Sequence, residues 1–203
     1  DIKDDLANVD DYVAFAKTVA VDLAVDLGVR IIQLRAKGVR QELVREWAIA
    51  MQRICRERQA IFVLNDYPEM AYEIGADAVH VGQDGGPLEA VRAIVGPDML
   101  IGRSTHSPEQ ALAAVAEGAD YIGFGPLFPT GTKPERPAIG LQDIATVQAQ
   151  LGDFPMFCIG GINGSTLPAV LAAGARRVVI VSWLLQHPAP AAAAKEIICQ
   201  LSR

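Results

Sequence analysis

Aromatic residues are scarce in this sequence, and long hydrophobic runs are absent. Only 6% of the 203 residues are aromatic, although 51% are hydrophobic. Apolar sequences that are poor in aromatics favour helices packed on parallel strands over a β-sandwich. No apolar run approaches the roughly 20 residues of a membrane-spanning helix, and no secretory signal precedes the first helical pattern. We therefore expect a cytoplasmic protein with no membrane partner.

Cysteine and positive charge are also in short supply. Cys55, Cys158 and Cys199 stand singly in apolar segments, which excludes the spacing of a zinc site. We expect all three to pack as small hydrophobic residues in a reducing compartment. The formal net charge of −6 argues against a nucleic-acid partner, because such proteins gather lysine and arginine.

A short unit recurs along the chain. In each copy a glycine ends a predicted helix in the left-handed conformation, and a β-branched strand begins two or three residues later. The four copies begin at Gly28, Gly75, Gly118 and Gly174. Apolar segments predict three more strands, at Ala60–Leu64, Met99–Gly102 and Pro155–Ile159.

Helical patterns alternate with these strands. Helices are predicted over Tyr12–Leu27 and Gln41–Arg56, and another begins at Ser107 with a capping glutamine at Gln110. This alternation, with polar residues after each strand, predicts an α/β protein, a (β/α)8 TIM barrel in one domain over residues 1–203. Seven strands are evident, and because Asp1–Asp10 offers no candidate, we expect the first barrel strand to lie upstream.

The segment that ends at Lys133 carries the strongest functional pattern. Two glycines and two prolines fix its backbone after a buried strand. Its tip consists of Thr130, Gly131, Thr132 and Lys133. Hydroxyls, accessible backbone N–H groups and an ammonium are the groups that bind a phosphate. A solvated loop is the alternative, but similar chemistry follows other strands.

Polar residues at the other strand ends fit the same chemistry. Gln33, Arg35 and Lys37 alternate, so their side chains share one face. Asp66 is the candidate magnesium ligand, because a carboxylate facing a diphosphate shares the ion with the phosphate oxygens. Ser104 can hydrogen-bond a substrate.

The last two strands also end in a phosphate-binding pattern. Gly161 follows one of them, and Val181 and Ser182 follow the other, where barrels commonly bind phosphate through backbone N–H groups. Two histidines stay open to either interpretation. His80 fits a core residue as well as a site residue, and His106 fits a loop residue as well as a proton carrier.

In this order the motifs resemble those of the thiamine-phosphate synthase family. The shared motifs are Gln-Leu-Arg-x-Lys from Gln33, Asn-Asp from Asn65, Ser-Thr-His from Ser104 and Phe-Pro-Thr-x-Thr-Lys ending at Lys133. The resemblance implies a transferase of thiamine biosynthesis that uses Mg2+. It would couple 4-amino-2-methyl-5-hydroxymethylpyrimidine diphosphate to 4-methyl-5-(2-phosphooxyethyl)thiazole and release pyrophosphate through a dissociative substitution.

The resemblance also implies a role for each matching position. The pyrimidine diphosphate and the thiazole phosphate would contact Gln33, Leu34, Arg35, Ala36, Lys37, Asn65, Ser104, Thr130, Gly131, Thr132, Lys133, Gly161, Val181 and Ser182. Catalysis would depend on Arg35, Lys37, Ser104 and Lys133, and Asp66 would bind magnesium. The cations would stabilise the departing pyrophosphate, so no nucleophilic side chain is needed.

The sequence departs from the family pattern at Gly85, where a second magnesium-binding aspartate is expected. Asp84 precedes it and could replace that carboxylate. Two alternatives therefore stay open, a thiazole tautomerase with His106 as proton carrier and a non-catalytic barrel that binds a phosphate ligand. The sequence allows a homo-oligomer but does not predict one.

Overall fold

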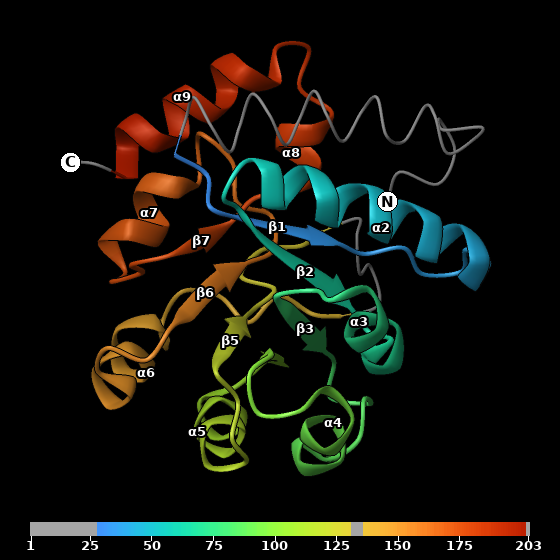
Figure 1. The fold of residues 1–203 in the computed structure, drawn as a ribbon. Helices are drawn as coiled ribbons and strands as arrows, with labels where there is room; N and C mark the ends of the chain where they lie inside the picture. Colours follow the sequence, from blue (N-terminus) through green and yellow to red (C-terminus); the bar gives the residue numbers. More distant parts are fainter. Residues whose placement is uncertain (1–27, 131–135, 202–203) are drawn as a thin grey trace. The chain divides into compact units, whose positions relative to one another are not determined.

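The computed structural model describes residues 28–130 and 136–201 (Figure 1). The chain forms two compact units. The first runs to His80 and also contains Ala90–Met99, and the second contains Val81–Glu89 and Leu100–Arg203. The predicted helix over Tyr12–Leu27 and the acidic segment before it lie outside the described residues. A single domain over the whole chain stays a prediction.

The first unit is a parallel sheet covered by helices. Its strands follow the chain in the order β1, β2, β3, at Ile31–Leu34, Ile61–Asn65 and Ala78–Val81. Its helices are α2 (Gln41–Glu57), α3 (Pro68–Ile74) and most of α4 (Leu88–Val95). Helix α2 lies along β1 and β2 (Figure 1). It buries an apolar face that includes Val44, Ala48, Met51 and Cys55.

The second unit repeats this arrangement. Its parallel strands are β4 (Leu100–Thr105), β5 (Tyr121–Phe124), β6 (Met156–Ile159) and β7 (Val178–Val179), in chain order. Its helices are α5 (Pro108–Ala116), α6 (Ile144–Leu151), α7 (Leu167–Ala172), α8 (Ser182–Leu185) and α9 (Pro190–Leu201). Strands and helices alternate from β1 to α8, as the sequence predicts, and α9 follows α8 directly.

The predicted glycine caps after α3, α5 and α7 are confirmed, whereas the helix that Gly28 would cap lies outside the described residues. Gly28, Gly75, Gly118 and Gly174 all have left-handed φ angles, between 67° and 99°. In the two copies that continue as Gly-Ala-Asp, the aspartate joins consecutive strands. The carboxylate of Asp77 accepts from the N–H of Phe62 at 2.8 Å, and the carboxylate of Asp120 accepts from the N–H of Ile101 at 2.8 Å.

Three sequence expectations differ from the structure. Strand β4 continues to Thr105 rather than ending at Gly102, because its last residues pair with β5. Ser107 caps α5 as predicted, but the Gln110 side chain accepts from the N–H of His106 instead of that of Ser107. Cys55 and Cys158 are buried, whereas Cys199 is exposed on α9 and does not pack in the core.

Within residues 28–130 and 136–201, no helix combines the length and the apolar character needed to cross a membrane.

Candidate active site

The carboxyl ends of β1 and β2 bring several predicted site residues to one edge. Leu34 pairs with Leu64, so Arg35 and Asn65 each follow a member of that pair. Side chains alternate between buried and accessible from Gln33 to Lys37, with Leu34 and Ala36 buried. The alternation thus continues beyond the last residue of β1. Contact between a substrate and either buried residue would be through its backbone.

Lys37 and Asp66 form an ion pair at this edge. The Nζ atom of Lys37 lies 3.2 Å from Oδ2 of Asp66, and their side chains are 55% and 33% exposed. Asp66 has a left-handed backbone with φ of 63°, and Tyr67 follows with φ of 54°. Such a conformation is strained in a residue as bulky as tyrosine. It turns the chain out of β2, and the Asp66 N–H donates to the carbonyl of His80 at 2.8 Å.

The acidic residues at this edge fit magnesium in one particular way. Among the described residues, no three His, Cys, Asp or Glu side chains cluster into a complete metal cage. Magnesium in phosphate sites needs only one or two carboxylates, with water and phosphate oxygens completing the octahedron. The accessible carboxylate of Asp66 fits this pattern. It therefore suits an ion that arrives with a diphosphate.

The turn after β3 contains Gly85, where the sequence departs from the family pattern, and its neighbours pack closely against this glycine. A Cβ atom on Gly85 would lie 3.0 Å from Cβ of Val81 and 3.1 Å from the carbonyl oxygen of Gly82. A larger residue would therefore require its neighbours to move. The carboxylate of Asp84 is 97% exposed and lies 3.8 Å from Nη2 of Arg136.

In the second unit, the segment after β5 is joined to the end of β6. The N–H of Leu127 donates to the carbonyl of Ile159 at 2.9 Å, and that of Phe128 donates to Gly160 at 3.1 Å. Gly161 has φ of 68°, and a Cβ atom there would lie 2.6 Å from Cβ of Phe128. Only glycine fits this contact, which places the Gly-Gly backbone against the segment leading to Thr130.

The end of β7 lies beside this Gly-Gly turn. Ile159 pairs with Val179, so Gly161 and Val181 each lie two residues beyond a paired position. Ser182 begins α8, and it is half-buried like Thr130. Three predicted residues of the phosphate loop, Gly131, Thr132 and Lys133, lie outside the described residues.

Ser104 and the two histidines are placed as follows. Ser104 lies within β4, and its carbonyl accepts from Nε2 of Gln83 at 2.6 Å. Nδ1 of His106 forms a hydrogen bond with the carbonyl of Gly125, so this nitrogen holds a loop in place. His80 is buried in β3.

Sequence reasoning missed Arg103. This arginine lies in β4 and is almost completely buried. A charged residue directly after the apolar run Met99–Gly102 was the available signal, but the predicted strand ended before it.

Comparisons with known proteins show the family to which this chain belongs. The sequence matches the thiamine monophosphate synthase family over residues 9–184. A thiamine-phosphate synthase from Acidothermus cellulolyticus is 43% identical over 90% of this chain and 86% of its own length. Another, from Synechocystis sp., is 38% identical over 90% of this chain. That relative is longer, and the chain spans about half of it, 53%.

A solved structure extends the similarity to the fold. The thiamine phosphate pyrophosphorylase from Pyrococcus furiosus superposes with a TM-score of 0.81 at 28% identity, over 94% of this chain and 89% of its own. The fold class is therefore the predicted α/β, TIM-barrel-like one. The sequence match and the fold lead to the same conclusion. The chain belongs to the thiamine monophosphate synthase family, and it is by homology a transferase of thiamine biosynthesis.

Proposed function

We propose that this chain couples 4-amino-2-methyl-5-hydroxymethylpyrimidine diphosphate to 4-methyl-5-(2-phosphooxyethyl)thiazole and releases pyrophosphate. The observation that carries the proposal is the Lys37–Asp66 pair at the ends of β1 and β2. A magnesium diphosphate needs a carboxylate for the metal and a cation for the phosphate oxygens. An isomerase that acts only on a thiazole phosphate has no diphosphate substrate, so it needs neither this carboxylate nor this cation.

The pyrimidine diphosphate occupies the edge formed by β1 and β2. Arg35 and Lys37 contact the diphosphate, and the side-chain amides of Gln33 and Asn65 orient the pyrimidine. The side chains of Gln33 and Lys37 are exposed there, and Arg35 is half-buried. Ser104 and Lys133 complete the proposed contacts, together with the backbone of Leu34 and Ala36.

The reaction breaks the bond between the methylene carbon of the pyrimidine and the diphosphate oxygen. The electrons of that bond leave with pyrophosphate, and the aminopyrimidine ring stabilises the positive charge on the methylene carbon. The thiazole nitrogen then donates its lone pair to that carbon and forms the new C–N bond. Arg35 and Lys37, together with Lys133, are the cations proposed to stabilise the negative charge that grows on the leaving group.

Asp66 would hold the magnesium ion, alone among the carboxylates assigned to the site. When bound, Mg2+ neutralises charge on the diphosphate and makes it a better leaving group. The chain's own cations do the same from fixed positions, and none of its side chains needs to act as a nucleophile.

The thiazole phosphate is proposed to bind where β6 and β7 end. The backbone of Gly161, Val181 and Ser182 supplies N–H donors, and Thr130 and Thr132 supply hydroxyls with Gly131 between them. The close contact between Gly161 and Phe128 supports this assignment. It holds the Gly-Gly backbone beside the segment that carries the two threonines.

A pyrophosphate-release assay tests the function. We expect release only when the pyrimidine diphosphate, the thiazole phosphate and Mg2+ are all present. Asp66→Ala should abolish the metal-dependent release, whereas Asp84→Ala should change it only a few-fold, about the effect of an exposed charge. No release from folded protein would reject the proposal in favour of a tautomerase or a binding protein, and isomerisation of the thiazole alone would identify the tautomerase.

A further inference from the structure

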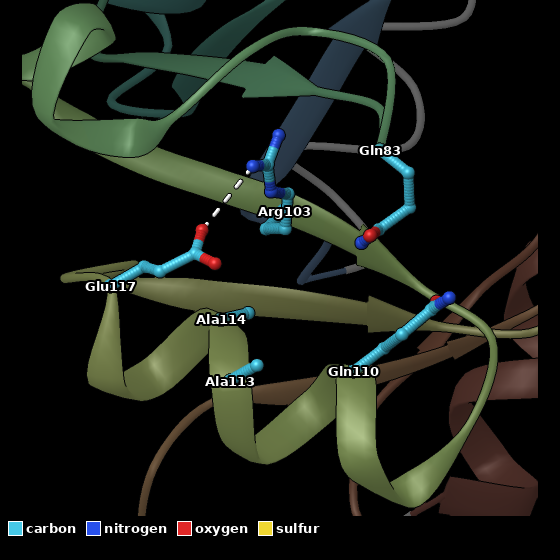
Figure 2. Close-up of a pocket in the computed structure, with 6 residues that line it drawn as sticks. All are labelled: Gln83, Arg103, Gln110, Ala113, Ala114 and Glu117. Carbon is cyan, nitrogen blue, oxygen red and sulfur yellow. Dashed lines mark hydrogen bonds and ion pairs between the residues drawn. The ribbon is translucent and has the colours of Figure 1, made fainter.

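Arg103 is a buried cation with three partners. Its Nη1 atom donates to the carbonyl of Gly82 at 2.7 Å, and its Nη2 atom donates to the carbonyl of Gly86 at 2.7 Å. Nη2 also lies 3.3 Å from Oε2 of Glu117, at the end of α5 (Figure 2). The Arg103 side chain is only 7% exposed, whereas that of Glu117 is 48% exposed.

The two hydrogen bonds to backbone carbonyls fix both ends of one turn. The turn Gly82–Gly86 follows β3 and contains Asp84 and Gly85, and a backbone bond from Gly85 N–H to Gly82 O at 3.0 Å closes it. The planar guanidinium can bind two carbonyls and a carboxylate together because its donors point in fixed directions. Burying a charge is costly unless such partners are present, so the buried guanidinium depends on these two carbonyls and this carboxylate.

Gln83 provides a second tie between the same turn and β4. Its Nε2 atom donates to the carbonyl of Ser104, at 2.6 Å. Arg103 and Ser104 are consecutive residues, so the turn is fixed to β4 at two adjacent positions. The position of Ser104 and the shape of the turn are therefore coupled.

Arg103 is placed to support substrate binding without contacting a substrate. Its side chain borders a cavity of about 50 Å³ that is lined also by Gln83, Gln110, Ala113, Ala114 and Glu117 (Figure 2). None of the residues that line this cavity is among the proposed substrate contacts. The guanidinium therefore supports the turn and does not itself contact a substrate.

We propose that Arg103 is a positioning residue that holds the Gly82–Gly86 turn and Ser104 in the geometry that binds the pyrimidine diphosphate. This inference rests on the proposed function, in which Ser104 contacts that substrate. Glu117 supplies the counter-charge that keeps the guanidinium directed at the turn. The residue thus affects one of the two substrates selectively.

The test compares Arg103→Met and Arg103→Lys with the unmodified protein. For Arg103→Met we expect the KM for the pyrimidine diphosphate to rise about tenfold or more, the usual effect of losing a supporting residue behind a binding group. The KM for the thiazole phosphate should change less than about twofold. Arg103→Lys should recover only part of the loss, because one ammonium cannot span both carbonyls and the carboxylate.

Arg92 offers a matched control. Its Nη1 atom also donates to backbone carbonyls, those of Gly96 at 3.0 Å and Met99 at 2.5 Å, just before β4 begins. Arg92→Met should lower the melting temperature without separating the two KM values. Equal changes in both KM values for Arg103→Met, or a loss of stability alone, would overturn the inference.

Two further measurements keep the test decisive. If Arg103→Met does not fold, Gln83→Leu should show the same selective rise in KM, and its absence would count against the proposal. Calorimetry with Mg2+ and pyrophosphate measures binding without turnover. If the unmodified protein releases no pyrophosphate, the proposed function fails. The role of Arg103 is still tested by binding, because the inference requires Arg103→Met to bind pyrophosphate more weakly than Arg92→Met does.

Discussion

The ammonium of Lys37 lies 3.2 Å from the carboxylate of Asp66, and both side chains are accessible to solvent. An ion pair between exposed side chains contributes about 0–1 kcal/mol to stability. The pair is therefore a poor stabiliser of the fold. In the proposed function, the pair holds opposite charges at the carboxyl ends of two neighbouring strands, where a substrate and its metal would separate them.

The first prediction concerns this ion pair. Asp66→Asn should reduce kcat/KM by about 100-fold or more and raise the Mg2+ concentration needed for half-maximal activity, because a neutral amide is a weaker magnesium ligand. Lys37→Met should raise the KM for the pyrimidine diphosphate about tenfold, the value of roughly 1.4 kcal/mol of binding energy. Both variants should unfold in urea within about 1 kcal/mol of the unmodified protein.

Arg45→Met is the control for this pair. Arg45 on α2 and Glu73 on α3 form an ion pair at 2.5 Å with side chains 44% and 52% exposed. Its loss should affect stability as little as the changes above and leave the kinetics unchanged. A large loss of stability in Asp66→Asn, with activity unchanged in the folded fraction, would assign the pair a structural role only.

The second prediction concerns the close contact at Gly161. A methyl group there would overlap Cβ of Phe128 at 2.6 Å, and the backbone is left-handed. Gly161→Ala should therefore displace the Gly-Gly turn and raise the KM for the thiazole phosphate at least tenfold, with the other KM less affected. Steady-state kinetics with each substrate varied in turn would measure the difference.

Gly75→Ala separates backbone strain from steric overlap. Gly75 is also left-handed, with φ of 67° and ψ of 46°, but a Cβ atom there meets only Nη2 of Arg56 at 3.9 Å. We expect a stability loss of about 1–2 kcal/mol from the left-handed backbone and unchanged KM values. Similar kinetics in the two variants would remove Gly161 from the phosphate site.

The periodic parts of the fold could be predicted from the sequence. Helix α2 was expected at Gln41–Arg56 and is found at Gln41–Glu57, because its apolar spacing is a local feature of the sequence. The end of β4 was not predictable in this way. Thr105 belongs to the strand because it pairs with Phe124, a partner that local sequence does not specify.

In the candidate site, the exposure of side chains could be predicted where it follows from the alternation along a strand. Gln33 and Lys37 are exposed while Leu34 is buried, as the period of a strand requires. Arg103 could not be given a role, because its partners, Gly82, Gly86 and Glu117, are brought to it by the tertiary fold. The hydrogen bond between Gln83 and Ser104 could not be predicted from the sequence for the same reason.

The third prediction concerns Asp120, which joins β5 to β4. Its carboxylate accepts from the N–H of Ile101 at 2.8 Å, and its own N–H donates to the carbonyl of Ile101 at 2.8 Å. Asp120→Ala leaves the N–H of a buried residue without its acceptor, which costs about 1–3 kcal/mol. Urea unfolding should show this loss, and Asp120→Asn should recover part of it.

Asp153→Ala is the control for Asp120. Asp153 lies 3.4 Å from Arg176, and both side chains are exposed, so the free energy of unfolding should change by less than about 0.5 kcal/mol. An equal effect of the two alanine variants would show that the Asp120 hydrogen bonds contribute nothing measurable.

The fourth prediction concerns the three cysteines. Burial, reinforced by the charge of Asp77, raises the pKa of Cys55 to about 12, and burial raises the pKa of Cys158 to about 12. The thiolate is the reactive form, so both thiols should resist a disulfide reagent at pH 8, while the exposed Cys199 reacts. Native protein should therefore titrate one thiol per chain, and denatured protein all three.

The same pKa shifts predict how stability depends on pH. The folded protein holds these two thiol protons more tightly than the unfolded chain, whose cysteines titrate near pH 9.0. The resulting stabilisation is fully present below pH 9 and is lost progressively as the pH rises towards 12. Unfolding in urea at pH 8 and pH 10 should show the decline, and Cys55→Ala with Cys158→Ala should make it shallower. A decline that is equally steep in the double variant would attribute it to other groups.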